Sequence, residues 1–124
     1  MMNKTLDKNK ETIKKYFELS DFASDDQQAV NDIIDLFADN VAIRSGCNET
    51  ATNKEEAAAF FRSFFSQNKK LKHIFNTHTI ENYYQTEWSV AGLKSDGSIF
   101  ALHGFDYYRF DDDGKICSLL IEIK

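Results

Sequence analysis

The chain has 124 residues, of which 42% are hydrophobic and 28% are charged, so the composition predicts one folded domain over 1–124 rather than a disordered chain. The net charge is −5, which argues against a nucleic-acid-binding surface, because phosphate recognition needs a basic face. Eleven Phe, five Tyr and one Trp favour a thickly packed core or a pocket lined with aromatic rings.

The sequence also indicates where in the cell the protein is expected and whether it needs a cofactor. The N-terminal residues 1–10 contain no apolar stretch, so no secretory signal is expected. The longest apolar runs are about five residues, far short of the roughly 20 that cross a bilayer, so no membrane partner is expected either. Cys47 and Cys117 form no CxxC pair and are predicted to be reduced thiols in or near the core of a cytoplasmic protein. There is no P-loop, GxGxxG or HExxH motif, and we expect no cofactor and no metal.

The first half of the chain reads as helical. Apolar residues cluster on one side of a predicted helix over 6–19. Residues 24–27 (Ser-Asp-Asp-Gln) form a capping box that opens a second helix, which is predicted to run to Phe37 and to end at 38–40. The apolar positions that carry the two patterns are Ile13, Tyr16, Phe17 and Leu19, then Val30, Ile33, Ile34 and Phe37.

A short strand and a third helix follow. Residues 41–45 alternate with branched side chains and predict a strand, and 46–51 are predicted to be a loop. Thr52 and Glu55 have the spacing of a second capping box. The helix that it opens carries four phenylalanines, which we interpret mainly as core packing and secondarily as a pocket wall: Phe60, Phe61, Phe64 and Phe65.

From Leu71 the period changes to two. Strands are predicted over 72–84, 85–94, 98–110 and 115–124, and the basic cluster before them at 69–73 is predicted to be a solvated loop. The order of elements predicts an α+β fold, with helices on one face of an antiparallel sheet.

Two turns join the last three strands. Residues 95–98 (Ser-Asp-Gly-Ser) favour a tight hairpin turn. The acidic run at 111–115 resembles a calcium loop only superficially, because Lys115 stands where an oxygen ligand is needed. We therefore interpret 111–115 as a turn.

Both faces of the last strands carry apolar side chains. In 98–110, Phe100, Leu102, Gly104, Asp106, Tyr108 and Phe110 share the face that we assign to the interior, and His103 lies on the opposite face, as a surface or interface residue. In 115–124, Cys117, Leu119, Ile121 and Ile123 share one face, and Ile116, Ser118, Leu120 and Glu122 share the other. A sheet with water on one side should alternate cleanly, so a homodimer through the sheet is expected.

The ordered pattern resembles a known superfamily. Its segments are 12–17, 35–43, 54–57, 106–111 and 113–116, and together they span nearly the whole chain. They are similar to the nuclear transport factor 2-like superfamily, and within it to SnoaL-like and ketosteroid-isomerase-like proteins. The resemblance implies a cone-shaped, cystatin-like α+β roll, in which a curved antiparallel sheet wraps around three N-terminal helices and encloses a pocket.

The resemblance also carries site residues over. In ketosteroid isomerases a Tyr on the first helix and a protonated Asp on a late strand form an oxyanion hole, and these positions match Tyr16 and Asp106. The general base of those enzymes follows the first strand, and here that position falls on Ser45, which is no proton shuttle without a partner. His73 and His78 resemble a His that begins the first long strand in SnoaL-like proteins. Their parity differs, so only one of them can reach the pocket, and the alternation leaves open which.

Each candidate also has a structural reading. Asp106 is a functional acid or a hydrogen-bonded structural one, and Tyr16 is a donor to a ligand or a core ring. Gly104 leaves a gap beside Asp106 that we interpret as room for a ligand. The other residues expected to line the pocket are Trp88, Val90, Leu102, Tyr108, Phe60, Phe64, Leu119 and Ile121.

Two functions compete at this point. The first is a pocket for a small apolar or carbonyl-containing molecule, with isomerase-, cyclase- or dehydratase-like acid–base chemistry through Asp106 and Tyr16. The second is a non-catalytic dimeric adaptor of the same fold. Because Ser45 occupies the position that matches the general base of ketosteroid isomerases, the question of catalysis stays open.

Overall fold

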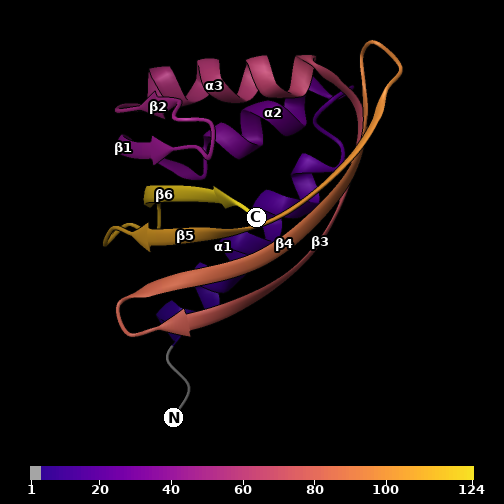
Figure 1. Ribbon diagram of the computed structural model, residues 1–124. Helices are drawn as coiled ribbons and strands as arrows, with labels where there is room; N and C mark the ends of the chain where they lie inside the picture. The colour runs from indigo at the N-terminus through magenta and orange to yellow at the C-terminus, as the bar shows by residue number, and fades with distance from the viewer. Residues whose placement is uncertain (1–3) are drawn as a thin grey trace.

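Three helices and a six-stranded sheet make up residues 4–124, the part of the chain that the computed structural model describes (Figure 1). The elements are α1 (Lys4–Ser20), α2 (Gln27–Ile34), β1 (Phe37–Arg44), β2 (Thr50–Ala51), α3 (Lys54–Ser66), β3 (Asn68–Ile80), β4 (Tyr83–Lys94), β5 (Ile99–Phe110) and β6 (Ile116–Ile123). The predicted α+β class and the order of its main elements are confirmed; only the two-residue β2 was not predicted.

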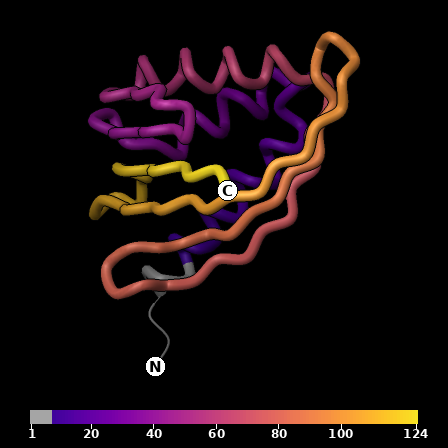
Figure 2. Tube along the Cα trace, viewed as in Figure 1, coloured from indigo at the N-terminus to yellow at the C-terminus, as the bar shows by residue number. Residues whose placement is uncertain are grey.

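The sheet is curved and unclosed, and the helices lie on its concave side. Its strand order is β2-β1-β6-β5-β4-β3. The long strands β3, β4 and β5 bend around the helices, as the tube in Figure 2 shows. The prediction of an antiparallel sheet was wrong in one place: β1 pairs with β6 in parallel, so the sheet is mixed. The parallel pair arises because β6 returns beside β1 only after the chain has passed through α3 and the hairpins.

The second helix begins and ends elsewhere than predicted. Its N-cap is Asp26, whose carboxylate accepts the backbone N–H groups of Gln28 and Ala29 at 3.0 and 3.3 Å. The negative charge of the Asp26 carboxylate is favoured over the Ser24 hydroxyl at the positive end of the helix. The buried Oγ of Ser24 has no hydrogen-bond partner among the described residues. The helix stops at Ile34, and Phe37, predicted to be helical, is instead the fully buried first residue of β1.

The cap of α3 lies one residue further along than predicted. Asn53 is the N-cap, and its side chain accepts the backbone N–H of Glu56 at 2.8 Å. The Glu56 carboxylate reaches back to the backbone N–H and the hydroxyl of Thr52, at 2.8 and 3.0 Å. The arrangement resembles a capping box, except that the Glu56 carboxylate returns to Thr52, the residue before the N-cap, and not to the backbone N–H of Asn53.

The predicted and observed strand boundaries agree best where a glycine lies in the turn between two strands. Gly97 and Gly114 both have positive φ, at 91° and 79°, in the two turns that were predicted. The Asp111 side chain accepts the backbone N–H groups of Asp113 and Lys115, so the acidic run is a closed turn. The hairpin between β3 and β4 turns at 81–82 rather than at 84–85, and the basic cluster at 69–73 belongs to β3 and is not a loop.

A bulge reverses the predicted faces at the start of β6. Ile116 was predicted to lie on the face opposite to Leu119, but both side chains are buried. The pairing explains the difference, since Phe110 lies opposite Ile116 and Arg109 lies opposite Ser118, which leaves Cys117 as an extra residue. From Leu119 onward the predicted inward face holds, and Leu119 is buried.

The core lies between the helices and the concave face of the sheet. Its largest fully buried side chains are Tyr108, Phe37, Phe61, Ile13, Ile33, Ile116 and Leu119. Within residues 4–124, none of the helices is both long and apolar enough to cross a membrane. Over the same range, no three His, Cys, Asp or Glu side chains group closely enough to hold a metal ion.

Candidate functional site

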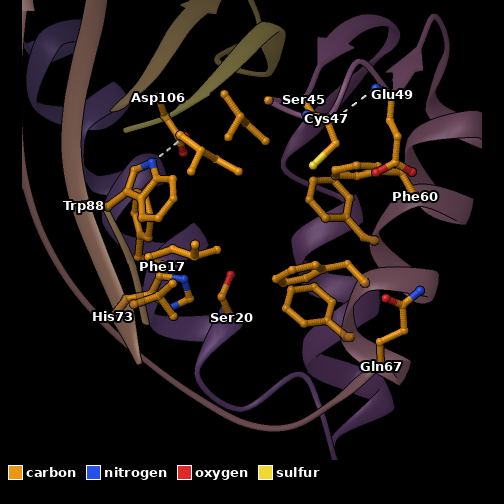
Figure 3. Close-up of a pocket in the computed structure, with 18 of the residues that line it drawn as sticks. Phe17, Ser20, Ser45, Cys47, Glu49, Phe60, Gln67, His73, Trp88 and Asp106 are labelled. Atoms are coloured by element: carbon orange, nitrogen blue, oxygen red, sulfur yellow. Dashed lines mark hydrogen bonds between the residues drawn. The ribbon is translucent and has the colours of Figure 1, made fainter. Parts of the chain in front are cut away.

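A cavity of about 190 Å³ separates the phenylalanines of α3 from the inner face of the sheet (Figure 3). Most of its wall is apolar and aromatic. Eight of the residues predicted for the site lie on this wall: Tyr16, Phe60, Phe64, Trp88, Val90, Leu102, Asp106 and Ile121. They come from α1, α3, β4, β5 and β6, so the fold gathers them from the whole length of the chain.

Three predicted residues lie behind the wall instead. Tyr108 and Leu119 are buried in the core and do not border the cavity. The space beside Gly104 is already filled, because a Cβ there would overlap the carbonyl oxygen of Glu122 and come within 2.6 Å of the Trp88 ring. The interpretation of Gly104 as room for a ligand was therefore wrong: the glycine makes room for a tryptophan.

Asp106 is the buried acid of the site. It projects from the inner face of β5 and is 3% exposed. The indole Nε1–H of Trp88 donates to its Oδ1 at 2.8 Å, and the Tyr108 hydroxyl donates to its Oδ2 at 2.6 Å. Burial raises the pKa of Asp106 to about 7, although the bonds from Tyr108 and Trp88 act in the opposite direction. Both protonation states are accordingly populated near neutral pH.

Tyr16 supplies a second polar group beside Asp106. Its ring packs edge-on against Phe17, Phe37, Phe61 and Tyr108, with centroids 5.1 to 6.2 Å apart. Burial, followed by the negative charge of Asp106, raises the pKa of Tyr16 well above its usual value. The phenol therefore stays protonated. Its hydroxyl makes no hydrogen bond with another described residue, so it can donate one to a molecule in the cavity.

The structure answers which histidine faces the cavity. His73 lies on the wall, whereas His78 is exposed on the outer face of β3. The His73 ring nitrogen Nδ1 lies 2.7 Å from Oδ1 of Asp21, and the backbone N–H of His73 donates to the same oxygen at 3.0 Å. Burial lowers the pKa of His73, and the bond and charge of Asp21 offset only part of that effect. The ring is thus a neutral imidazole at pH 7.

Ser45 borders the cavity, but its hydroxyl makes no hydrogen bond to an acidic or basic side chain within residues 4–124. Its Oγ accepts the backbone N–H groups of Cys47 and Glu49 at 3.3 and 3.2 Å. Its own N–H donates to the carbonyl oxygen of Glu49 at 2.8 Å. The serine therefore shapes the loop that closes this side of the cavity. Cys47 is exposed in the same loop rather than set in the core, and both cysteines are free.

Sequence reasoning missed the part of the site that tertiary packing creates. Asp21 gave no signal, because it lies in a turn and is 52 residues from the histidine that it holds. Phe17 and Phe100 were assigned to apolar faces but not to the pocket. Phe61, Phe65 and His73 had been considered for the wall only as alternatives, and they lie on it. The wall residues that were not predicted as such are Phe17, Ser20, Gly46, Cys47, Glu49, Ser63, Gln67, Phe100 and Ile123.

Comparison with known proteins identifies the family. The sequence profile of the SnoaL-like domain matches residues 13–119. The chain belongs to the SnoaL-like family. No curated protein matches this SnoaL-like chain.

Solved structures agree with the family assignment. A nuclear transport factor 2-like protein of unknown function from Exiguobacterium sp. 255-15 is 30% identical, with a TM-score of 0.84 over 91% of this chain and 98% of that one. A candidate polyketide cyclase from Xanthomonas campestris pv. campestris has a TM-score of 0.81 over 97% of this chain and 93% of that one. The latter is only 12% identical, so its likeness to the SnoaL-like chain is one of fold.

Proposed function

We propose that this SnoaL-like protein binds a small, largely apolar carbonyl compound in the cavity and catalyses proton transfer on it. One observation carries the proposal: a phenol that stays protonated and a carboxyl group with a pKa of about 7 lie together on the wall of one aromatic cavity. An apolar pocket with a few converging polar groups and perturbed pKa values is the usual form of a small-molecule site.

The size of the cavity narrows the class of ligand. Its volume of about 190 Å³ is somewhat larger than the roughly 150 Å³ of an apolar cavity known to hold benzene. A single ring with one or two substituents fits, whereas a fused four-ring steroid does not fit within this volume. The aromatic side chains of Phe60, Phe64 and Trp88 would pack against such a ring.

The two polar groups would divide the chemistry between them. The Tyr16 hydroxyl donates a hydrogen bond to the carbonyl oxygen and stabilises the negative charge that develops there. Asp106 takes up or releases a proton near neutral pH, because its pKa lies close to the working pH. The hydrogen bonds with Trp88 and Tyr108 hold the carboxyl group of Asp106 in place both while it takes up a proton and while it releases one.

Binding can be measured with the protein's own fluorescence. Trp88 is the only tryptophan, and it borders the cavity, so a ligand that enters should change its emission. We expect cyclohexanone, a single-ring ketone, to change Trp88 emission saturably and to raise the melting temperature. Leu102→Phe fills the cavity and should weaken both effects.

The matched control for this binding test is Ile99→Phe. It adds the same ring to the same strand at a side chain that is 84% exposed and does not border the cavity. Equal affinity in the wild type and both variants would place binding outside the cavity. No response to cyclohexanone or to other single-ring ketones would reject the proposed ligand class and favour the adaptor function.

We also propose that a second copy of the chain covers the outer face of the sheet. Ile74 is 71% exposed there, Leu120 is 38% exposed, and Phe105 and Tyr107 are partly exposed on the neighbouring strands. His103 lies on the same face and pairs with Glu87 at 2.7 Å, in a half-exposed contact that a partner could border. This face is the specific observation that favours the dimeric adaptor as the alternative function.

The dimer is tested by its mass. Light scattering at micromolar concentration should give twice the 14.3 kDa of the chain. Ile74→Lys would place a charge in the proposed interface and should produce the monomer. Phe22→Lys, at an apolar side chain that is 64% exposed in the turn after α1 and outside the sheet, is the control for an added charge. A wild-type protein of 14.3 kDa would contradict the proposed dimer.

The cytoplasmic location stays a prediction, supported by the two free cysteines.

A further inference from the structure

We infer that the Asp21–His73 pair is a second proton-transfer group of this cavity, in which Nε2 of His73 is the base that removes a proton from the carbon beside the carbonyl of the bound molecule. The inference rests on the proposed function and extends it to a residue outside the Tyr16–Asp106 pair. His73 would supply the general base that is missing at the position of Ser45, where ketosteroid isomerases have theirs.

The geometry around Asp21 fixes the histidine. Oδ1 of Asp21 accepts both the ring Nδ1–H and the backbone N–H of His73, so the carboxylate determines the orientation of the ring and its tautomer. With the proton on Nδ1, the lone pair lies on Nε2. Nε2 makes no hydrogen bond with a described residue, and the ring borders the cavity across from Ser20 (Figure 3).

The surroundings of His73 favour a neutral base. Phe17 packs edge-on at 5.4 Å between centroids, and Phe75 stacks on Phe17 at 4.7 Å. The charged groups near the ring are Asp21 and, through it, the exposed Lys72, whose Nζ lies 3.9 Å from Oδ2 of Asp21. Because burial lowers the pKa of His73, its lone pair is available at pH 7.

Two proton-transfer groups occupy separate positions along one wall. His73 lies opposite Val90 in the β3–β4 pairing, and Asp106 is bonded to the Trp88 indole on the next inward position of β4. Figure 3 shows His73 and Asp106 on either side of the Trp88 ring. A ring molecule stacked on Trp88 would thus present one edge to His73 and the other to Asp106 and Tyr16.

The step balances without a co-reactant. Nε2 takes the proton, the C–H electron pair forms a carbon–carbon double bond, and the carbonyl π electrons move to oxygen as an enolate. The Tyr16 hydroxyl donates to that oxygen, and the imidazolium that forms is stabilised by the Asp21 carboxylate. The reverse transfer returns a proton to carbon, so in D₂O each cycle exchanges hydrogen for deuterium.

The exchange is the measurement. Proton NMR in D₂O should show that the protein accelerates deuterium uptake beside the carbonyl of cyclohexanone. His73→Gln should slow this uptake by about 100-fold, which is the low end of the contribution of a general base. Cyclohexanone affinity, read from Trp88 emission, should stay as in the wild type. His78→Gln, on the outer face of the same strand, is the matched control and should change neither quantity.

Asp21→Asn tests the positioning role of Asp21. The amide oxygen can still accept the N–H groups of His73, but the negative charge is lost. The charge of Asp21 raises the pKa of His73, so its removal should move the pH profile of the exchange rate to lower pH. A purely structural role for Asp21 would lower the amount of folded protein and leave the profile where it is.

The outcomes separate the two proposals. Saturable cyclohexanone binding with an exchange rate that His73→Gln does not change would overturn this inference and leave the proposed binding intact. Failure of binding would reject the proposed function. The role of His73 would then be tested by ¹⁵N NMR of the ligand-free protein at neutral pH. A ring proton on Nε2 would overturn the inference that Nε2 is a base, and a ring proton on Nδ1 would support it.

Discussion

Replacing Gly104 with alanine should lower the free energy of unfolding by about 3 kcal/mol, the upper part of the usual range for overpacking. The added Cβ would overlap the carbonyl oxygen of Glu122 and press on the Trp88 ring. The first obstacle is backbone of β6, which pairs with β5 at this point and cannot rotate away as a side chain does. Urea denaturation followed by circular dichroism measures the loss.

Two further variants distinguish this cause from a general effect of glycine replacement. Gly46→Ala is the control, because its nearest neighbours are mainly flexible side-chain atoms of Ile123 at 3.0 to 3.2 Å, and we expect a smaller loss. Trp88→Leu removes the ring contact together with the indole bond to Asp106, so Gly104→Ala is compared in the wild-type and in the Trp88→Leu backgrounds. We expect the same loss from Gly104→Ala in both. No loss in the Trp88→Leu background would show that the indole, and not the β6 backbone, limits the space.

The sequence predicted the fold well because its local signals agreed with its long-range ones. Gly97 and Gly114 marked turns that need a positive φ, and the two-residue alternation identified the inward face of β5, with Asp106 and Tyr108 on it. The errors came where two local solutions compete. Asp26 and Ser24 can both cap α2, and the extra residue at Cys117 that turns Ile116 inward leaves no mark in the alternation.

The site was predictable only in part. Residues on regular strands and helices could be assigned to a face, and eight of them reached the cavity wall. Whether an inward residue borders the cavity or the core depends on the curvature of the sheet and on neighbouring volumes, which is why Tyr108 and Leu119 lie behind the wall. The Asp21–His73 contact depends on how the turn after α1 meets β3, and no periodicity encodes that.

The stability of the protein should fall as the pH rises from about 4 to 7 through the contribution of Asp106. Its pKa is about 7 in the folded chain and 3.8 in the reference state, so in this window the unfolded chain releases a proton that the folded chain keeps. One pKa unit corresponds to about 1.4 kcal/mol, so the loss is on the order of 4 kcal/mol, and it levels off above pH 7.

Asp106→Asn isolates this effect from other titrating groups. The lowered pKa of His73 has the opposite sign, because it makes the folded chain more stable as the pH rises toward 6.5, and it is common to both proteins. Asparagine can keep both contacts: its Oδ1 accepts the Trp88 indole N–H, and its amide donates to the Tyr108 oxygen.

The difference in the free energy of unfolding between variant and wild type should therefore increase in favour of the variant from pH 4 to 7, and then stay constant. Urea titrations at pH 4, 5, 6, 7 and 8 measure it. Parallel curves would mean that the donors Trp88 and Tyr108 outweigh burial and that Asp106 is already ionised at pH 5. It would then act only as a fixed negative charge, and proton transfer in the cavity would depend on His73 alone.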